Sequence, residues 1–141
     1  MRDINTALLK TFYNAISTTG IPVYEGEEPD DVKHKIYAVL SDVQNIEKST
    51  KNSSDVQALI QVSVHSWEYK YNNSKTLNQA VDDIFQAVKP STNDVLDLSA
   101  DGLQMMNLSV QTDRTERFGE LGDKIFISRI LIFKSDIFVI S

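Results

Sequence analysis

Hydrophobic residues recur every three or four positions in two stretches of the chain, which is the spacing of an amphipathic helix. The first stretch predicts a helix over residues 3–18, which ends before Gly20 and Pro22 because proline has no amide hydrogen to continue it. The second stretch predicts a helix over residues 74–88, which ends before Pro90. The apolar stripes are Ile4, Ala7, Leu8, Phe12, Ala15 and Ile16 in the first helix, and Leu77, Ala80, Val81, Ile84, Phe85 and Val88 in the second.

Other segments show the alternation of apolar and polar residues that is typical of β-strands. Residues 56–67 alternate most regularly, and residues 103–112 predict a second such strand. Residues 35–43 and 124–133 are apolar on both faces, which indicates strands covered from two sides. The residues expected to face inward are Val56, Ala58, Ile60, Val62 and Val64 in the first strand and Met106, Leu108 and Val110 in the second.

The order of these elements predicts an α+β fold: a mostly antiparallel sheet of four to five strands with two helices packed on one face. We expect one domain over residues 1–141, because 141 residues fall in the single-domain size range. Residues 47–55 are polar and predict an exposed loop, and residues 113–122 predict a charged hairpin loop. Residues 135–141 are expected to form an apolar C-terminal tail.

Composition excludes several classes of protein. The formal net charge is −6, so the surface as a whole does not attract phosphate, and a general nucleic-acid binder is disfavoured. The absence of cysteine excludes disulfides, thiolate zinc sites and cysteine nucleophiles. No apolar leader follows Met1, and charges interrupt the apolar window at residues 124–140, so we expect neither a secretion signal nor a membrane anchor.

Few residues offer catalytic or metal-binding chemistry. His34 and His65 are the two histidines, and no nucleophile motif accompanies them. His65 falls on the polar side of a predicted strand, where a solvated or hydrogen-bonded ring is expected rather than a metal ligand. The acidic residues 25–31 lack the spacing of a calcium loop and predict a solvated loop. We therefore expect no enzyme activity, no cofactor and no metal.

Two features leave alternatives open. The charged residues between Asp113 and Glu120 mix both signs and fit either a solvated tip or a contact between subunits. Trp67, Tyr69 and Tyr71 fit either a base-stacking platform or packing in a core or interface, and the net charge favours packing. The apolar strands and tail exceed what one small sheet with helices on one face can bury, which predicts self-association.

The order of elements resembles the tail-completion and tail-terminator proteins of long-tailed bacteriophages. The resemblance covers nearly the whole chain: a helix ending at Gly20, the segments IPVYEGEEPDD and KIYAVLSDV, the strand ALIQVSVHSWEY closing on Trp67, the helix SKTLNQAVDDIFQAV and a final strand pair. Tyr24, Pro29 and Tyr37 match family positions, whereas Ile36 stands where the family usually has proline.

The resemblance implies a non-enzymatic virion protein that forms a hexameric ring on the tail tube, stops tube polymerisation and joins the tail to the head connector. Its partners would be other copies of itself, the tube protein and the connector protein, with DNA passing through the lumen without specific binding. Assembly would occur in the bacterial host cytoplasm. The alternatives are a head-completion or other minor connector protein, and a small-ligand-binding domain.

We assign the contacts of such a ring to two sets of residues. The expected subunit-interface residues are Arg114, Glu116, Arg117, Phe118, Ile137, Phe138, Val139 and Ile140. The expected contacts with the tube or connector are Glu47, Lys48, Lys51 and Asp55 in the polar loop.

Overall fold

The computed structural model describes residues 4–26, 36–47, 55–69, 75–90 and 94–140, and it confirms the α+β class. The helices are α1 (Asn5–Ser17) and α2 (Lys75–Val88). The strands are β1 (Val23–Glu25), β2 (Ile36–Glu47), β3 (Asp55–Tyr69), β4 (Leu103–Leu121) and β5 (Lys124–Val139), with a 3₁₀ turn at Ser99–Asp101 before β4. Both predicted helices and the strand predicted over 56–67 are present.

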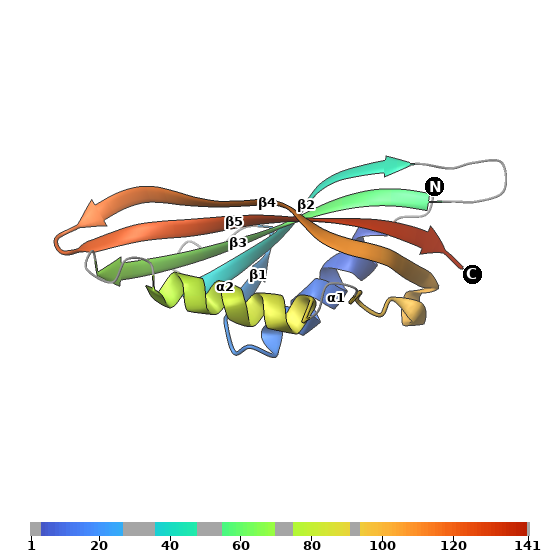
Figure 1. Cartoon of the computed structure of the whole chain (residues 1–141), viewed down its shortest axis with the longest axis horizontal. Coiled ribbons are helices and arrows are strands. Elements are labelled where there is room, and N and C mark those ends of the chain that lie inside the picture. The colour runs from blue at the N-terminus through green and yellow to red at the C-terminus, as the bar shows by residue number, and fades with distance from the viewer. Residues whose placement is uncertain (1–3, 27–35, 48–54, 70–74, 91–93, 141) are drawn as a thin grey trace.

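The strands form one twisted sheet in the order β1-β2-β3-β5-β4. Only β1 and β2 run parallel among the described strands, so the sheet is mostly antiparallel, as predicted. Both helices lie on the same side of this sheet, and the molecule is elongated along the strands (Figure 1). The β4–β5 hairpin forms one end, and the C-terminal end of β5 lies at the other (Figure 1).

The core lies between the sheet and the helices, because the apolar stripes of the helices face alternate residues of the strands. The even-numbered residues of β3 from Val56 to Val64 are all buried, as the alternation predicted. The ring of Phe133 on β5 joins the two helices to the sheet. Its centroid lies 5.4 Å from that of Phe12 on α1 and 6.1 Å from that of Phe85 on α2.

The prediction of a loop over residues 113–122 was wrong. β4 continues to Leu121, and the turn is confined to Gly122 and Asp123, where Gly122 adopts a φ of 64°. The segment is polar on both faces because β4 is an edge strand with solvent beside it, so charged side chains do not oppose strand pairing. The C-terminal tail is likewise part of a strand, since β5 runs to Val139 between β3 and β4.

The inward face of β4 also differs from the prediction. Met105 is 3% exposed, whereas Met106, predicted to face inward, is 57% exposed. A β-bulge between Met105 and Asn107 inserts one residue and shifts the alternation, so that Leu108 remains buried. A second irregularity follows Val110, which pairs with Phe133 but is 38% exposed.

Candidate functional site

A row of aromatic rings crosses the face of the sheet that the helices do not cover. Its members contact one another from strand to strand, with ring centroids 5.0 to 6.1 Å apart. We call this set the aromatic row: Tyr24 on β1, Tyr37 on β2, His65 and Trp67 on β3, Phe126 on β5 and Phe118 on β4. The row extends over all five strands of the sheet.

The aromatic row is most exposed at its β4 end. Tyr37 is 5% exposed, Trp67 and Phe126 are half-buried, and Phe118 is 58% exposed. Phe118 lies at a β-bulge between Arg117 and Gly119, which leaves its ring at the edge of the sheet. The exposed end of the row therefore offers apolar area to another molecule.

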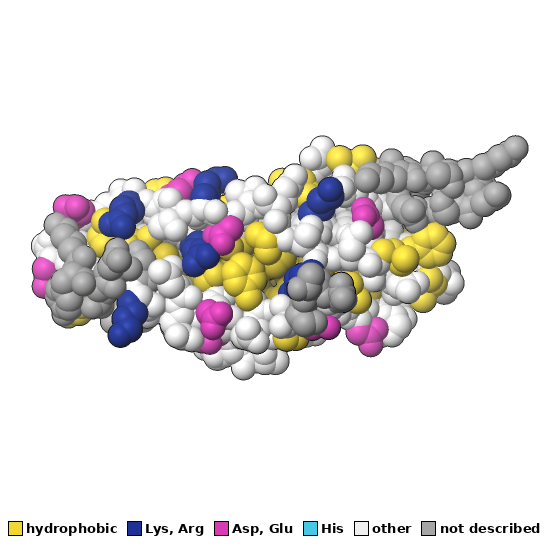
Figure 2. Space-filling model, viewed as in Figure 1, with side chains coloured by type: hydrophobic (Ala, Val, Ile, Leu, Met, Phe, Trp, Pro, Cys, Tyr) yellow, Lys and Arg dark blue, Asp and Glu magenta, His cyan; other side chains and the backbone are white. Residues whose placement is uncertain are grey.

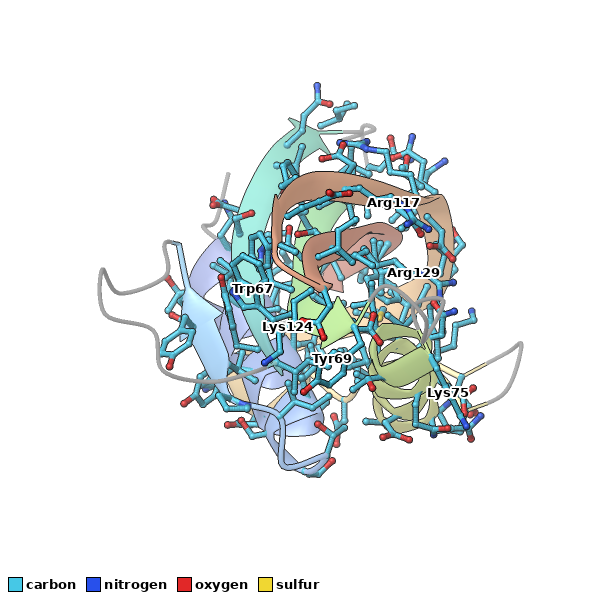
Figure 3. The ribbon with its side chains drawn as sticks, turned by 90° about the vertical axis from the view of Figure 1, so that its left-hand side faces the viewer. Trp67, Tyr69, Lys75, Arg117, Lys124 and Arg129 are labelled. Carbon is cyan, nitrogen blue, oxygen red and sulfur yellow. The ribbon has the colours of Figure 1, made fainter. Side chains whose placement is uncertain are left out.

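His65 and Trp67 are packed within this row. The Nδ1 atom of His65 lies 2.5 Å from the Ser128 hydroxyl, so the ring is hydrogen-bonded, as the sequence predicted. Trp67 stacks on Phe126 with an interplanar angle of 30°. Tyr69 has the Lys124 ammonium 5.1 Å from its ring centroid, and Trp67, Tyr69 and Lys124 lie together at the hairpin end of the sheet (Figure 3). The packing interpretation of Trp67 and Tyr69 fits this arrangement, and Tyr71 lies outside the described residues.

The charged residues of β4 form a second feature beside the aromatic row. The Arg114 side chain donates to Glu116 at 2.8 Å, and both side chains are exposed to solvent. Arg129 on β5 donates two hydrogen bonds of 2.7 Å to the Asp113 carboxylate and a third of 3.1 Å to Asn78 on α2. The hydrogen bonds to Asp113 raise the pKa of the Arg129 guanidinium above its ordinary value. Charged and apolar groups lie side by side on this molecule (Figure 2).

The interface residues predicted at the C-terminal end divide between core and surface. Ile137 is 1% exposed and belongs to the core, so its side chain is not accessible to a neighbouring subunit in this fold. Phe138 and Val139 are half-buried, and Ile140 is 52% exposed. The structure thus separates the predicted interface residues into a group on β4, toward the hairpin, and a group at the opposite end of the molecule (Figure 1).

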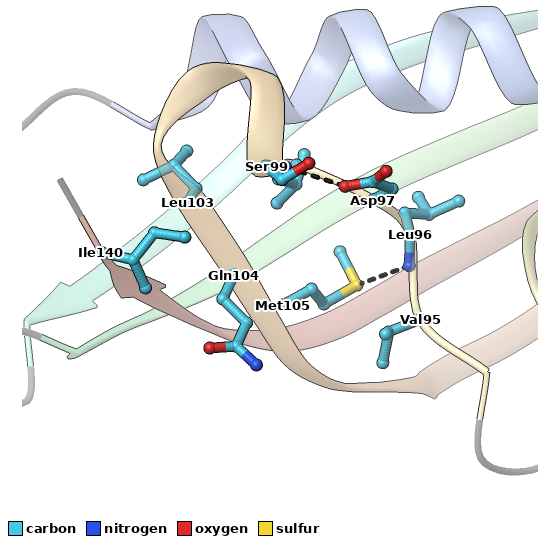
Figure 4. A pocket seen from close by; sticks show the side chains of 9 residues that line it. Val95, Leu96, Asp97, Ser99, Leu103, Gln104, Met105 and Ile140 are labelled. Atoms are coloured by element: carbon cyan, nitrogen blue, oxygen red, sulfur yellow. Dashed lines mark hydrogen bonds between the residues drawn. The ribbon is translucent and has the colours of Figure 1, made fainter.

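Ile140 borders an open groove of about 480 Å³. The groove lies between the start of β4 and the segment 95–99, and the Leu96 amide donates to the Met105 sulfur at 3.4 Å across it (Figure 4). Beside it, Asp97 accepts a hydrogen bond of 2.9 Å from the Ser99 amide. Hydrogen bonds from the Ser99 side chain and backbone lower the pKa of Asp97. The groove is mainly apolar and offers a second place for contact.

The four residues predicted to contact the tube or connector remain untested. Lys48 and Lys51 lie outside the described residues, as do the side chains of Glu47 and Asp55. The backbones of Glu47 and Asp55 end β2 and begin β3, so the polar segment predicted over 47–55 connects these antiparallel strands.

Glu68, a buried charged residue, was not identified by the sequence analysis. Glu68 on β3 is 1% exposed, and its Oε1 atom accepts hydrogen bonds from the amides of Thr76 (2.7 Å) and Leu77 (3.3 Å) at the start of α2. A carboxylate there satisfies amides that have no partner within the helix and interacts favourably with the helix dipole. The alternation of β3 places Glu68 on the inward face, which was the signal available in the sequence.

The described residues hold neither a cluster of metal-binding side chains nor a membrane-spanning helix. There, no group of three or more histidine, cysteine, aspartate or glutamate residues is placed to hold a metal ion. The helices α1 and α2 are both too short to cross a membrane, and no other described helix is suited to it.

Solved structures with a similar fold are known, although no model of a protein family and no curated protein sequence matches this chain. A chain from the "virion of native gene transfer agent (GTA) particle" aligns with a TM-score of 0.70 and 17% sequence identity, covering 98% of this chain and 99% of the other. A second solved structure aligns with a TM-score of 0.50 and 15% identity, covering 94% of this chain and 92% of the other. At these identities the likeness establishes a shared fold.

Proposed function

We propose that this chain is a structural, non-enzymatic protein of a phage-type virion. The observation that carries the proposal is the alignment, over almost the full length of both chains, with a chain of a gene transfer agent virion. The two chains are similar in length as well as in fold. The exposed apolar area on this chain suits a protein that functions inside an assembly.

Within the virion, we propose a ring that caps the end of the tail tube, stops its polymerisation and joins the tail to the head connector. A closed ring of identical subunits needs a contact in which two different surfaces of one subunit meet. The chain offers two such surfaces at opposite ends: the exposed end of the aromatic row at Phe118, and the apolar groove beside Ile140. Six copies would form the ring that the family resemblance implies.

The acidic composition supports a passage through which DNA slides without binding. The net charge of −6 repels phosphate over the surface as a whole. The tube protein, the connector protein and other copies of the chain are the proposed partners, and the polar segment 47–55 is the proposed contact with the tube or connector.

The proposal is tested with purified protein added to polymerising tail-tube subunits, followed by negative-stain imaging and native mass spectrometry. We expect six-membered rings at one end of the tubes and tubes of limited length. Attachment to DNA-filled heads rather than to tube ends would favour a head-completion protein instead. A protein that leaves both heads and tubes unoccupied would contradict the virion assignment.

The surface is tested by comparing Phe118→Ala with Met106→Ala. These residues lie on the same strand and are 58% and 57% exposed, so both substitutions should change folding stability by less than about 0.5 kcal/mol. We expect Phe118→Ala to reduce the fraction of subunits in rings, and Met106→Ala to leave it unchanged. Equal ring formation by both variants would remove Phe118 from the interface.

A further inference from the structure

β4 presents a long open edge. It has 19 residues and stands last in the strand order, so within the described part of the chain one side of its backbone lacks a strand partner. Such an edge exposes amide and carbonyl groups that can pair with another chain. The opposite edge strand, β1, has only three residues. Among the described strands, β2 beyond β1 is also open on that side, from Ser41 to Glu47. The edge of β4 is therefore the longer of the two.

The charges on this edge have an antisymmetric pattern. The regular stretch between two bulges contains Asp113, Arg114, Thr115, Glu116 and Arg117, with charges of −, +, 0, − and +. If a second copy of the stretch runs in the opposite direction with Thr115 opposite Thr115, each charged residue lies opposite a residue of the other sign. Two copies that pair antiparallel about this residue thus have complementary side chains at all four charged positions.

We propose that two copies of this chain form a dimer by antiparallel pairing of β4 with β4, about a two-fold axis at Thr115. Asp113 of each copy then lies opposite Arg117 of the other, and Arg114 lies opposite Glu116. Opposite residues of an antiparallel pair project to the same face of the sheet. The pairing of β4 with β5 is consistent with this arrangement. Asp113 and Arg117 lie opposite the core residues Leu131 and Ile127, so both project to the helix-covered face. Arg114 and Glu116 both project to the other face.

The same charges disfavour pairing registers in which the two-fold axis lies at a residue next to Thr115. A two-fold axis at Arg114 would place the two Arg114 side chains opposite each other, and an axis at Glu116 would do the same with two carboxylates. Like charges directly opposite are destabilising. Charged residues on an edge strand usually prevent pairing, and here they permit one register while opposing the registers beside it.

The side chains are available for this contact. Thr115 and Arg117 are exposed, and Arg117 forms no ion pair within the described part of the chain. Asp113 is one-third exposed, and its carboxylate retains acceptor capacity beside its two bonds from Arg129. Arg114 and Glu116 already attract each other within the strand and are exposed enough to contact a second copy as well.

The dimer does not depend on the proposed ring and has a different symmetry. Both contacts use residues of β4 near Phe118, so the dimer must separate before a ring forms. A two-fold contact uses the same surface on both copies and closes after two, whereas a ring needs two different surfaces. The dimer would be the form of the free protein, with its open edge covered. The dimer is tested with the purified chain alone. Its result is therefore independent of the result of the tail-tube experiment.

The test measures dimerisation by sedimentation velocity over a concentration series, and it compares the wild-type chain with variants in which one charge of the pattern is reversed. We expect the wild-type chain to be a dimer, and Arg114→Glu or Glu116→Arg alone to weaken the dimer about tenfold or more, because each creates two like-charge pairs. A mixture of the two variants should restore it, because every facing pair is then opposite in charge. The chain with both substitutions should also dimerise like wild type. Circular dichroism verifies that each variant folds.

The register is tested by cross-linking, because the chain has no cysteine of its own. Thr115→Cys should form a disulfide between copies under mild oxidation. Ser109→Cys, exposed on the same strand but far from the proposed axis, should not. A monomeric wild-type chain, single variants that dimerise like wild type, a mixture that stays monomeric, or equal cross-linking at both positions would overturn the proposal.

Discussion

The two faces of the sheet are both apolar, but they are covered in different ways. On one face, α1 and α2 bury residues such as Val62, Val64 and Leu131 completely. On the other face, the described rings of the aromatic row cover one another, and burial falls from Tyr37 to the 58% exposed Phe118. The comparison shows that an apolar strand face can be largely buried by its own neighbouring side chains without a second layer.

The polar groups on the two faces differ as well. On the open face, small hydroxyl groups are hydrogen-bonded to neighbouring side chains: Ser63 accepts from Gln61 at 2.9 Å, and Ser128 contacts His65. On the helix-covered face, a buried carboxylate, Glu68, binds the start of α2. These hydrogen bonds offset part of the cost of removing polar groups from water.

The largest expected effect compares one phenylalanine from each face. Phe133→Ala removes the ring that contacts both Phe12 and Phe85, and we expect a loss of about 3–5 kcal/mol in the free energy of unfolding. Phe126→Ala on the open face removes a half-buried ring, and we expect a loss of about 1–2 kcal/mol. Urea denaturation followed by circular dichroism measures both values.

The two variants must be compared at one protein concentration, because self-association would add to apparent stability. Similar losses for the two substitutions would mean that the open face is as well packed as the helix-covered face, and the contrast between the faces would fail.

A smaller effect is expected at Glu68. Glu68→Ala removes the acceptor for the first amides of α2, and we expect a loss of about 1–2 kcal/mol together with reduced helix content. Glu68→Gln retains an oxygen that can accept one of these bonds and should lose less. If the alanine variant unfolded at the wild-type urea concentration, the carboxylate would contribute nothing to the attachment of α2.

The sequence predicted the helices, the central strands and the sidedness of β3, because each has one continuous apolar stripe with a regular period. It failed along β4, since two irregularities change the alternation near Met106 and Val110, and an edge strand tolerates charges on both faces. The aromatic row was also missed as a unit. Tyr24, Tyr37 and Phe126 are far apart in the chain, and only strand order and register bring them together.

The smallest expected effect concerns Asp97, beside the groove on the helix-covered side. Its pKa is lowered from an ordinary value of 3.8 because the ionised carboxylate accepts hydrogen bonds from Ser99. The folded state therefore favours ionised Asp97, and this contribution to stability is complete above the ordinary pKa and is lost as pH falls through the lowered one. Asp97→Asn keeps the shape but does not ionise, so the wild-type chain should have the higher thermal midpoint at neutral pH. The difference should shrink as pH falls below 3.8, and a difference independent of pH would show that the Asp97 charge does not stabilise the Ser99–Asp101 turn.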